Sequence, residues 1–234
     1  MTRIKALLFD KDGTLFDFAT TWEAWAEAFL MRACSGDRDR AGKVGRTVGF
    51  DLKNRQFAKD SVVIAGTPGE VTQALLPHFP EMTAAALDRL LNDEAEAAPQ
   101  AQAVPLAPLL TDFRGRGLHL GVATNDAERP ARAHLHQADI TGFFDFIAGY
   151  DSGHGAKPAP GQMLAFADQI GIPTGQIAMI GDSTHDLRAG RAAGMVCVGV
   201  LTGMADHATL DPFADVVLTD IGHLPDWLDS RSRV

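Results

Sequence analysis

Short apolar runs recur along the chain, and polar or amphipathic stretches separate them. The first run, from Ile4 to Phe9, is nearly continuous and ends in charged and glycine residues, as a buried parallel strand followed by a loop does. Similar apolar runs occupy residues 118–123, 144–148, 177–180, 195–200 and 216–218. Segments of helical period lie between most of these runs, and this alternation predicts an α/β fold with a doubly wound, Rossmann-like parallel sheet.

The interval between the first two predicted strands is too long for a simple crossover. About a hundred residues lie there, whereas a crossover needs only about a dozen. Part of this interval has apolar residues at the i, i+3, i+4, i+7 and i+8 positions of an amphipathic helix, namely Trp22, Trp25, Ala26, Phe29 and Leu30. Thr20 and Glu23 form a candidate capping box at the start of this helix.

Two further stretches of the same interval, around residues 71–75 and 87–91, also carry leucine and valine at helical spacing. We therefore predict an inserted helical cap over residues 18–99, with residues 1–17 and 100–234 forming the α/β core. Prolines follow the predicted exit of the insertion, and we expect the two connecting segments to act as hinges.

Composition and charge exclude several classes of protein. With 46% hydrophobic and 22% charged residues, the chain has the composition of a globular domain with a substantial core. The net charge of −9 argues against nucleic acid as a partner, and no apolar run approaches the roughly 18 residues of a membrane span. Cys34 and Cys197 lack the spacing of metal ligands, so we interpret them as packing residues of a protein in a reducing cytoplasm. Nothing in the sequence indicates an oligomeric state.

Two carboxylates follow the first predicted strand, in the segment from Asp10 to Thr14. Residues two apart on an extended chain point the same way, so Asp10 and Asp12 can face one site while Lys11 turns aside. In a doubly wound sheet the ligand crevice lies beyond the carboxyl ends of the strands, and Gly13 would let the backbone leave sharply. The alternative is an acidic turn after an edge strand.

Three more polar fragments stand at or after the ends of later predicted strands: Thr124-Asn125, Lys157-Pro158, and Asp182 with Asp186. In this order, the fragments resemble the motifs of the haloacid dehalogenase superfamily, which are an Asp-x-Asp-Gly-Thr strand end, a Ser or Thr strand end, a Lys and an acidic pair. The resemblance covers nearly the whole chain. Residues 157–195 are especially similar to the branch that includes phosphoglycolate phosphatases.

The resemblance implies a Mg²⁺-dependent phosphatase acting on a small phosphorylated metabolite, with 2-phosphoglycolate as a candidate substrate. Asp10 would be the nucleophile that forms an aspartyl-phosphate, and Asp12 would be the proton shuttle. Lys157 would balance the acidic cluster and hold the phosphoryl group together with Thr124 and Asn125. The expected Mg²⁺ ligands, which are hard oxygen donors, come from Asp10, the Asp12 carbonyl, Asp182 and Asp186.

Several of these assignments have structural alternatives. Lys157 could be a solvated loop residue, and Thr124 or Asn125 could cap the helix that begins near residue 127. Asp186 forms a possible capping box with Ser183, so it either binds the metal directly, acts through another ligand, or has no metal role. The Trp22 and Trp25 stripe is interpreted as cap core rather than as a substrate platform.

A carboxylated substrate would require a cation from the cap. Arg46, Lys53 and Arg55 are available there, although the alternative for each is an ordinary solvated face. His154 and His185 are interpreted as polar surface residues and left out of the site.

The chain departs from the family pattern at three places, one of which is Asp17-Phe18, where relatives often have Asp-Ser. Lys11 stands where the phosphatase branch prefers an apolar residue, and Asp126 stands where phosphoglycolate phosphatases often have Lys. Asp12 separates the chain from the dehalogenase branch, which generally lacks that second acid. Two other functions remain open: a phosphosugar mutase of the same fold, and a non-catalytic phospho-ligand or receiver-like module.

Overall fold

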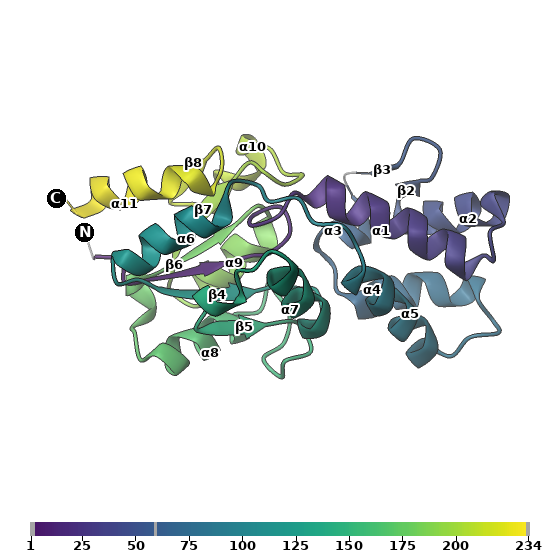
Figure 1. The fold of residues 1–234 in the computed structure, drawn as a ribbon, viewed down its shortest axis with the longest axis horizontal. Coiled ribbons are helices and arrows are strands. Elements are labelled where there is room, and N and C mark those ends of the chain that lie inside the picture. The colour runs from purple at the N-terminus through teal and green to yellow at the C-terminus, as the bar shows by residue number, and fades with distance from the viewer. Residues whose placement is uncertain (1–2, 59, 233–234) are drawn as a thin grey trace.

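A parallel sheet forms the centre of the computed structural model, which describes residues 3–58 and 60–232 (Figure 1). Over these residues, six strands pair in the order β5-β4-β1-β6-β7-β8, and all neighbours run parallel. The strands are β1 (Ala6–Phe9), β4 (His119–Ala123), β5 (Phe146–Ala148), β6 (Ile177–Gly181), β7 (Val196–Val200) and β8 (Val216–Leu218). Each lies within or overlaps one of the predicted runs, so the predicted α/β fold is confirmed.

Helices cover both faces of this sheet. The core helices are α6 (Leu106–Gly115), α7 (Glu128–Gln137), α8 (Gly161–Ile170), α9 (Thr184–Ala192), α10 (His207–Leu210) and α11 (Leu224–Ser232). On β1, Leu7 and Phe9 belong to a buried cluster with α6 and α11, whereas Ala6 and Leu8 belong to one with α8 and α9. Alternate side chains of β1 therefore face opposite layers, which explains why the strand is apolar throughout.

The register of the sheet brings three strand ends together. Phe9 lies opposite Val122 of β4 on one side and Ile180 of β6 on the other. The segments that follow these three strands therefore leave the sheet at the same edge. Strand order reverses at β1, and a crevice for a ligand forms at such a switch point.

The inserted segment forms a mainly helical unit beside the sheet, at the end of the molecule away from the two chain termini (Figure 1). It contains α1 (Phe18–Ala33), α2 (Arg38–Gly45), α3 (Val62–Ala65), α4 (Pro68–Leu75), α5 (Ala84–Glu96) and a short antiparallel pair, β2 (Phe50–Asp51) and β3 (Gln56–Phe57). Its buried side chains form a cluster of their own between residues 18 and 98. The boundaries of a separate cap at residues 18–99 remain a prediction.

The two segments that connect the insertion to the sheet lie side by side. Asp17 donates its backbone N–H to the carbonyl of Ala101 at 2.8 Å, and Ala103 donates to the carbonyl of Leu15 at 2.9 Å. The segment that leads into the insertion and the segment that leads out of it are thus hydrogen-bonded to each other. Movement of the cap would have to bend both segments together.

The start of α1 differs from the prediction. The helix begins at Phe18, and its N-cap is Asp17, whose carboxylate accepts a hydrogen bond from Thr20 N at 2.7 Å. Thr20 lies inside the first turn, so the predicted capping box of Thr20 with Glu23 is wrong. Aspartate is as favourable as threonine at an N-cap, and Asp17 lies three residues before Thr20.

The core packing predicts a large cost for truncating a buried leucine. Leu110 of α6 is 0% exposed, whereas Leu164 of α8 is 42% exposed. Leu110→Ala should lower the free energy of unfolding by about 2–5 kcal/mol because it leaves a cavity, and Leu164→Ala should lower it by less than about 1 kcal/mol. Urea denaturation followed by circular dichroism measures both. Equal effects would contradict the packing described here.

Candidate active site

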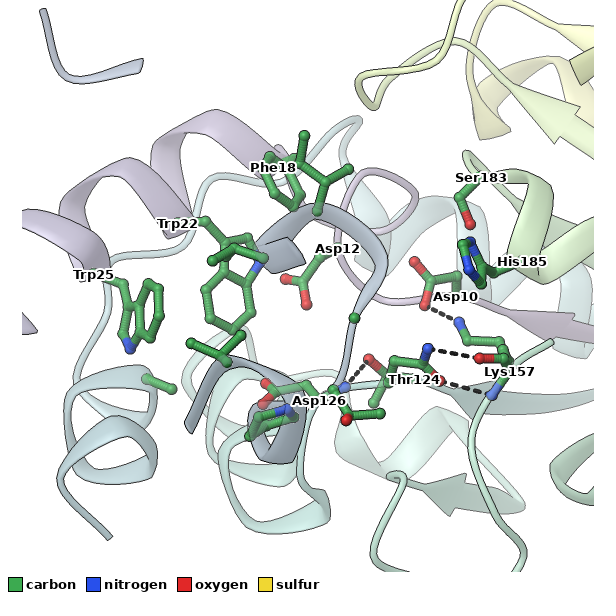
Figure 2. A pocket seen from close by; sticks show the side chains of 18 of the residues that line it. Asp10, Asp12, Phe18, Trp22, Trp25, Thr124, Asp126, Lys157, Ser183 and His185 are labelled. Carbon is green, nitrogen blue, oxygen red and sulfur yellow. Dashed lines mark hydrogen bonds and ion pairs between the residues drawn. The ribbon is translucent and has the colours of Figure 1, made fainter. Parts of the chain in front are cut away.

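Polar side chains from three neighbouring strands meet at the edge of the sheet where β1 ends. Asp10 follows β1, Thr124 follows β4 and Asp182 follows β6, and all three are buried. They line one pocket between the core and the helical insertion (Figure 2). All the sequence-predicted site residues line this pocket: Asp10, Asp12, Thr124, Asn125, Lys157, Asp182 and Asp186.

The turn after β1 depends on a glycine. Gly13 has φ +81°, a conformation that favours glycine, and its N–H donates to the Phe16 carbonyl at 2.7 Å. A Cβ atom at Gly13 would also overlap the Asp182 carboxylate, and a Cβ at Gly203 would do the same. Two glycines therefore leave the space that the Asp182 carboxylate occupies.

Lys157 is buried among acceptors. Its Nζ lies 2.5 Å from Asp10 Oδ1 and 2.6 Å from Asp186 Oδ1, and it donates to the Ala123 carbonyl at 2.9 Å. Burial lowers the pKa of Lys157, but the Asp10 and Asp186 carboxylates outweigh this effect and raise it. The ammonium is therefore charged at neutral pH, and the alternative of a solvated loop lysine is wrong.

Asn125 holds the backbone of the lysine loop. Its Oδ1 accepts from Lys157 N at 2.8 Å, and its Nδ2 donates to the Lys157 carbonyl at 3.0 Å. Helix α7 begins later, with Ala127 at the N-cap and no side-chain cap, so the alternative of Thr124 or Asn125 as a helix cap is wrong. A phosphate contact by Asn125 remains a prediction, alongside this observed role in placing Lys157.

Asp186 takes part in two arrangements at once. Its Oδ2 accepts from Ser183 N at 3.0 Å, and Ser183 Oγ accepts from Asp186 N at 3.4 Å, which completes the capping box predicted for α9. Its Oδ1 faces Lys157. The capping box therefore positions the carboxylate without removing it from the pocket.

Three carboxylates crowd one point of the pocket. Asp10, Asp182 and Asp186 have ligand oxygens within 4.8 Å of one another. Burial raises the pKa of Asp10 to about 7, with the Asp186 and Asp12 charges adding to the rise and Lys157 opposing it. Burial and the two neighbouring carboxylates also raise the pKa of Asp182 well above its ordinary value. One ammonium does not balance this cluster.

The chemistry of this donor set fits a hard divalent cation. Three carboxylates offer oxygen ligands at one place, and Mg²⁺ prefers oxygen ligands. A cation there would supply the positive charge that Lys157 alone does not. Asp10, Asp182 and Asp186 are thus the side chains that could hold it. The Asp12 side chain lies outside this cluster, and the expected contribution of its backbone carbonyl remains a prediction.

Asp12 belongs instead to a second buried charge group, centred on Lys11. The Lys11 ammonium is fully buried and lies 2.8 Å from Asp12 Oδ2, 3.2 Å from Asp126 Oδ2 and 2.8 Å from His134 Nδ1. It also lies 5.5 Å from the centre of the Trp22 ring. Lys11 and Asp126 both depart from the family pattern, and the structure places them against each other.

His134 carries this group on to the helical insertion. Its Nε2 lies 2.6 Å from the carbonyl oxygen of Ala95 in α5. A carbonyl only accepts, so Nε2 is the donor and Nδ1 accepts from Lys11. Burial and the Lys11 ammonium lower the pKa of His134 to about 4, so the ring is neutral at neutral pH. The chain of contacts runs from Asp12 through two buried side chains to the backbone of α5.

The lining of the pocket differs from the prediction at several residues. Trp22 and Trp25 belong to the buried core of the insertion, but they also line the pocket, so their interpretation as core alone was incomplete. His185, which the sequence analysis left out, also lines it. Asp126 was noted only as a departure from the family pattern, and that departure was the available signal.

The three cations considered for a substrate carboxylate do not reach this pocket. Arg46, Lys53 and Arg55 are exposed, and none is among the described residues that line it. Arg55 instead pairs with Glu27, at 3.1 Å between Nε and Oε2. The solvated-face alternative describes all three.

Sequence comparison adds independent evidence about the family. Residues 4–194 match the family model of haloacid dehalogenase-like hydrolases. The chain is 32% identical over 228 residues to the phosphoglycolate phosphatase of Rhodospirillum rubrum, an alignment that covers 96% of this chain and 90% of that protein.

Comparison with crystal structures shows the fold. A predicted phosphoglycolate phosphatase from Haemophilus somnus 129pt superposes with a TM-score of 0.73 at 19% identity, covering 97% of this chain and 98% of that one. β-Phosphoglucomutase from Clostridium difficile superposes with a TM-score of 0.66 at 18% identity, covering 99% and 100%. The fold is thus shared with proteins of more than one described activity.

The buried His134 predicts a pH-dependent loss of stability. Its pKa is about 4 in the folded state and about 6.5 in an unfolded chain, so the unfolded state binds more protons between these values. The contribution of His134 is present above pH 6.5 and is lost as pH falls toward 4, by on the order of 3 kcal/mol.

Urea unfolding of the wild type and of His134→Gln between pH 7.5 and 4.5 separates the contribution of His134 to the free energy of unfolding from that of other titrating groups. Gln keeps a donor for the Ala95 carbonyl but does not titrate. The stability difference between the two proteins should therefore change with pH in favour of the variant as the solution becomes more acid. A difference independent of pH would contradict the neutral, buried ring.

Proposed function

The chain belongs to the haloacid dehalogenase-like hydrolases and is a phosphatase of that family, and from this premise we propose how its pocket hydrolyses a small phosphomonoester through an aspartyl-phosphate. The observation that carries the proposal is the meeting of Asp10, Lys157 and the Asp182–Asp186 pair at one buried point. A carboxylate held against an ammonium, with room on the pocket side, has the surroundings of a nucleophile for a phosphate anion.

In the first step, a carboxylate oxygen of Asp10 attacks phosphorus, and the bond from phosphorus to the ester oxygen breaks. Asp12, in its protonated form, gives its proton to the departing oxygen, which leaves as an alcohol. Lys157 places positive charge beside Asp10 and the transferring oxygens, while Thr124 lines the same pocket as a hydroxyl partner.

In the second step, water attacks the phosphorus of the aspartyl-phosphate. Asp12, now a carboxylate, takes a proton from that water, and the bond from phosphorus to the Asp10 oxygen breaks to release inorganic phosphate. Lys11 lies against Asp12 and positions its side chain at the pocket. The cycle returns both aspartates to their starting states.

We propose Mg²⁺ as the cofactor, held by Asp10, Asp182 and Asp186 with the Asp12 backbone carbonyl as a further ligand. When bound, the cation supplies positive charge toward the phosphate oxygens and offsets the excess of carboxylates. Residues 18–99 would act as the cap that restricts bulk water.

The expected partner is a small phosphorylated metabolite. The name of the Rhodospirillum rubrum relative makes phosphoglycolate the first candidate, although the pocket lining considered below favours another class. No helix among the described residues has both the length and the apolar character needed to cross a membrane. A cytoplasmic location stays a prediction, and Cys34 and Cys197 are both free and buried.

A mutase is a second activity seen on this fold, but only the fold likeness connects it to this chain. A mutase returns the phosphoryl group to its substrate, whereas a phosphatase releases it to water. Measuring inorganic phosphate against isomer formation from hexose phosphates separates the two. Steady-state phosphate release would also dispose of a silent phospho-ligand module.

Replacing the nucleophile should abolish turnover. We expect Asp10→Asn to lower kcat for p-nitrophenyl phosphate by at least about a thousandfold, because an amide is a poor nucleophile and a poor metal ligand. Asp168→Asn, at an exposed position of α8, is the matched control and should keep wild-type activity. EDTA should also stop the wild-type enzyme, and added Mg²⁺ should restore it. Undiminished turnover by Asp10→Asn would refute the nucleophile assignment.

Replacing the proton shuttle should have an effect that depends on the leaving group. Asp12→Asn cannot protonate a departing alkoxide, so hydrolysis of an alkyl phosphate should fall by about a hundredfold or more. Formation of the phosphoenzyme from p-nitrophenyl phosphate should fall much less, because p-nitrophenolate leaves without a proton. Burst kinetics with both esters measures the first step. Equal losses for the two esters would assign Asp12 a purely structural role.

A further inference from the structure

The cap wall of the pocket is built mainly from apolar side chains. Figure 2 shows Trp22 and Trp25 across the pocket from Lys157, with Asp12 between the tryptophans and the lysine. The two indole rings meet edge to face at 5.2 Å between centroids and 78° between planes. The large apolar lining residues of the insertion are Phe18, Trp22, Trp25, Val63, Ile64, Val71 and Leu91. A substrate that reaches this wall meets aromatic and aliphatic surface.

Positive charge near the pocket is already paired. Lys157 is the one lysine or arginine among the described residues that line it, and its ammonium lies against Asp10 and Asp186. Lys11 lies behind the lining, surrounded by Asp12, Asp126 and His134. Asp12 and Asp126 themselves line the pocket. A second anionic group that reaches the cap side would meet these two carboxylates with no lysine or arginine left to balance it, which is costly in a buried site. His185, the remaining basic side chain of the lining, lies on α9 of the core.

The start of α4 does not supply a free anion site either. Gly66, Thr67 and Pro68 line the pocket at this helix terminus. Glu70 Oε2 accepts from Thr67 N at 2.7 Å, Thr67 Oγ1 accepts from Glu70 N, and Pro68 has no N–H. The helix is therefore capped by its own carboxylate, which repels a second one.

One polar atom on the cap side lacks a partner. Asn92 Oδ1 is buried at the pocket and accepts no hydrogen bond from the described residues. A buried acceptor without a donor costs free energy, and a substrate O–H or N–H would satisfy it. The cap wall thus combines apolar surface with one side-chain acceptor.

We propose that the pocket selects phosphomonoesters whose alcohol part is uncharged and carries an aromatic or similarly apolar body, and that it discriminates against carboxylated esters such as 2-phosphoglycolate. This inference rests on the proposed phosphatase function and names the substrate class of the same site. The phosphate meets Asp10 and Lys157 on the core side, and the apolar body packs against Trp22, Trp25 and Ile64 on the cap side.

A panel of three phosphate esters tests the proposal in the wild-type enzyme with Mg²⁺. Phenethyl phosphate carries a ring, ethyl phosphate lacks one, and 2-phosphoglycolate carries a carboxylate. We expect kcat/KM for phenethyl phosphate to exceed that for ethyl phosphate by at least about tenfold, with 2-phosphoglycolate lowest. Equal values across the panel, or a preference for 2-phosphoglycolate, would overturn the inference.

Variants at the cap wall sharpen the test. Ile64→Lys adds a cation to the lining, so it should raise kcat/KM for 2-phosphoglycolate and lower it for phenethyl phosphate, each by about tenfold or more. Leu164→Lys is the matched control: it adds the same charge at an exposed position of α8 outside the pocket lining and should keep the wild-type order of the three esters. Asn92→Leu should raise kcat/KM for phenethyl phosphate severalfold, because this ester cannot satisfy the buried acceptor.

The outcomes separate this inference from the proposed function. Turnover that Asp10→Asn abolishes but that shows no preference for the aromatic ester overturns the inference and leaves the phosphatase mechanism standing. Absence of hydrolysis for every ester overturns the proposed function and the inference with it. If Ile64→Lys fails to fold, the wild-type panel together with Asn92→Leu decides the question.

Discussion

Carboxylates buried close together repel one another, and the core of this molecule is arranged around that constraint. Asp10, Asp182 and Asp186 converge because β1 and β6 are adjacent and in register, while Lys157 lies among them to offset part of the charge. Asn125 clamps the lysine backbone from both sides. The residual negative charge favours binding of a divalent cation, and in the proposed mechanism that cation would offset the carboxylates that otherwise repel a dianionic phosphate.

The pocket divides its chemistry between two structural units. The sheet edge contributes charged groups, and the inserted helices contribute rings and aliphatic side chains. Lys11 and His134 join the two, since one holds Asp12 and the other bonds the backbone of α5. This contact holds α5 of the insertion against the core. The position of the insertion and the position of the Asp12 carboxylate are therefore linked through contacts between buried groups.

Sequence reasoning found the sheet and the motif residues because both leave local patterns. Apolar runs mark buried parallel strands, and short polar fragments at their ends mark the crevice. It failed where two neighbouring residues could serve as the same helix cap and where the answer depended on distant packing. The capping of α1 by Asp17 rather than Thr20 was a local competition between equivalent caps. The pairing of Lys11 with Asp126 and His134, and the exposure of Trp22 to the pocket, arise only when segments more than a hundred residues apart fold together.

The facing charges of Lys11 and Asp126 constrain how this chain can diverge. Both are buried, and Lys11 pairs with Asp12 as well as with Asp126, so replacing Lys11 alone by an apolar residue would leave two carboxylates without their buried cation. The residues at positions 11 and 126 are therefore expected to change together. Few viable sequences lie between this pattern and one with an apolar residue at position 11 and a lysine at position 126.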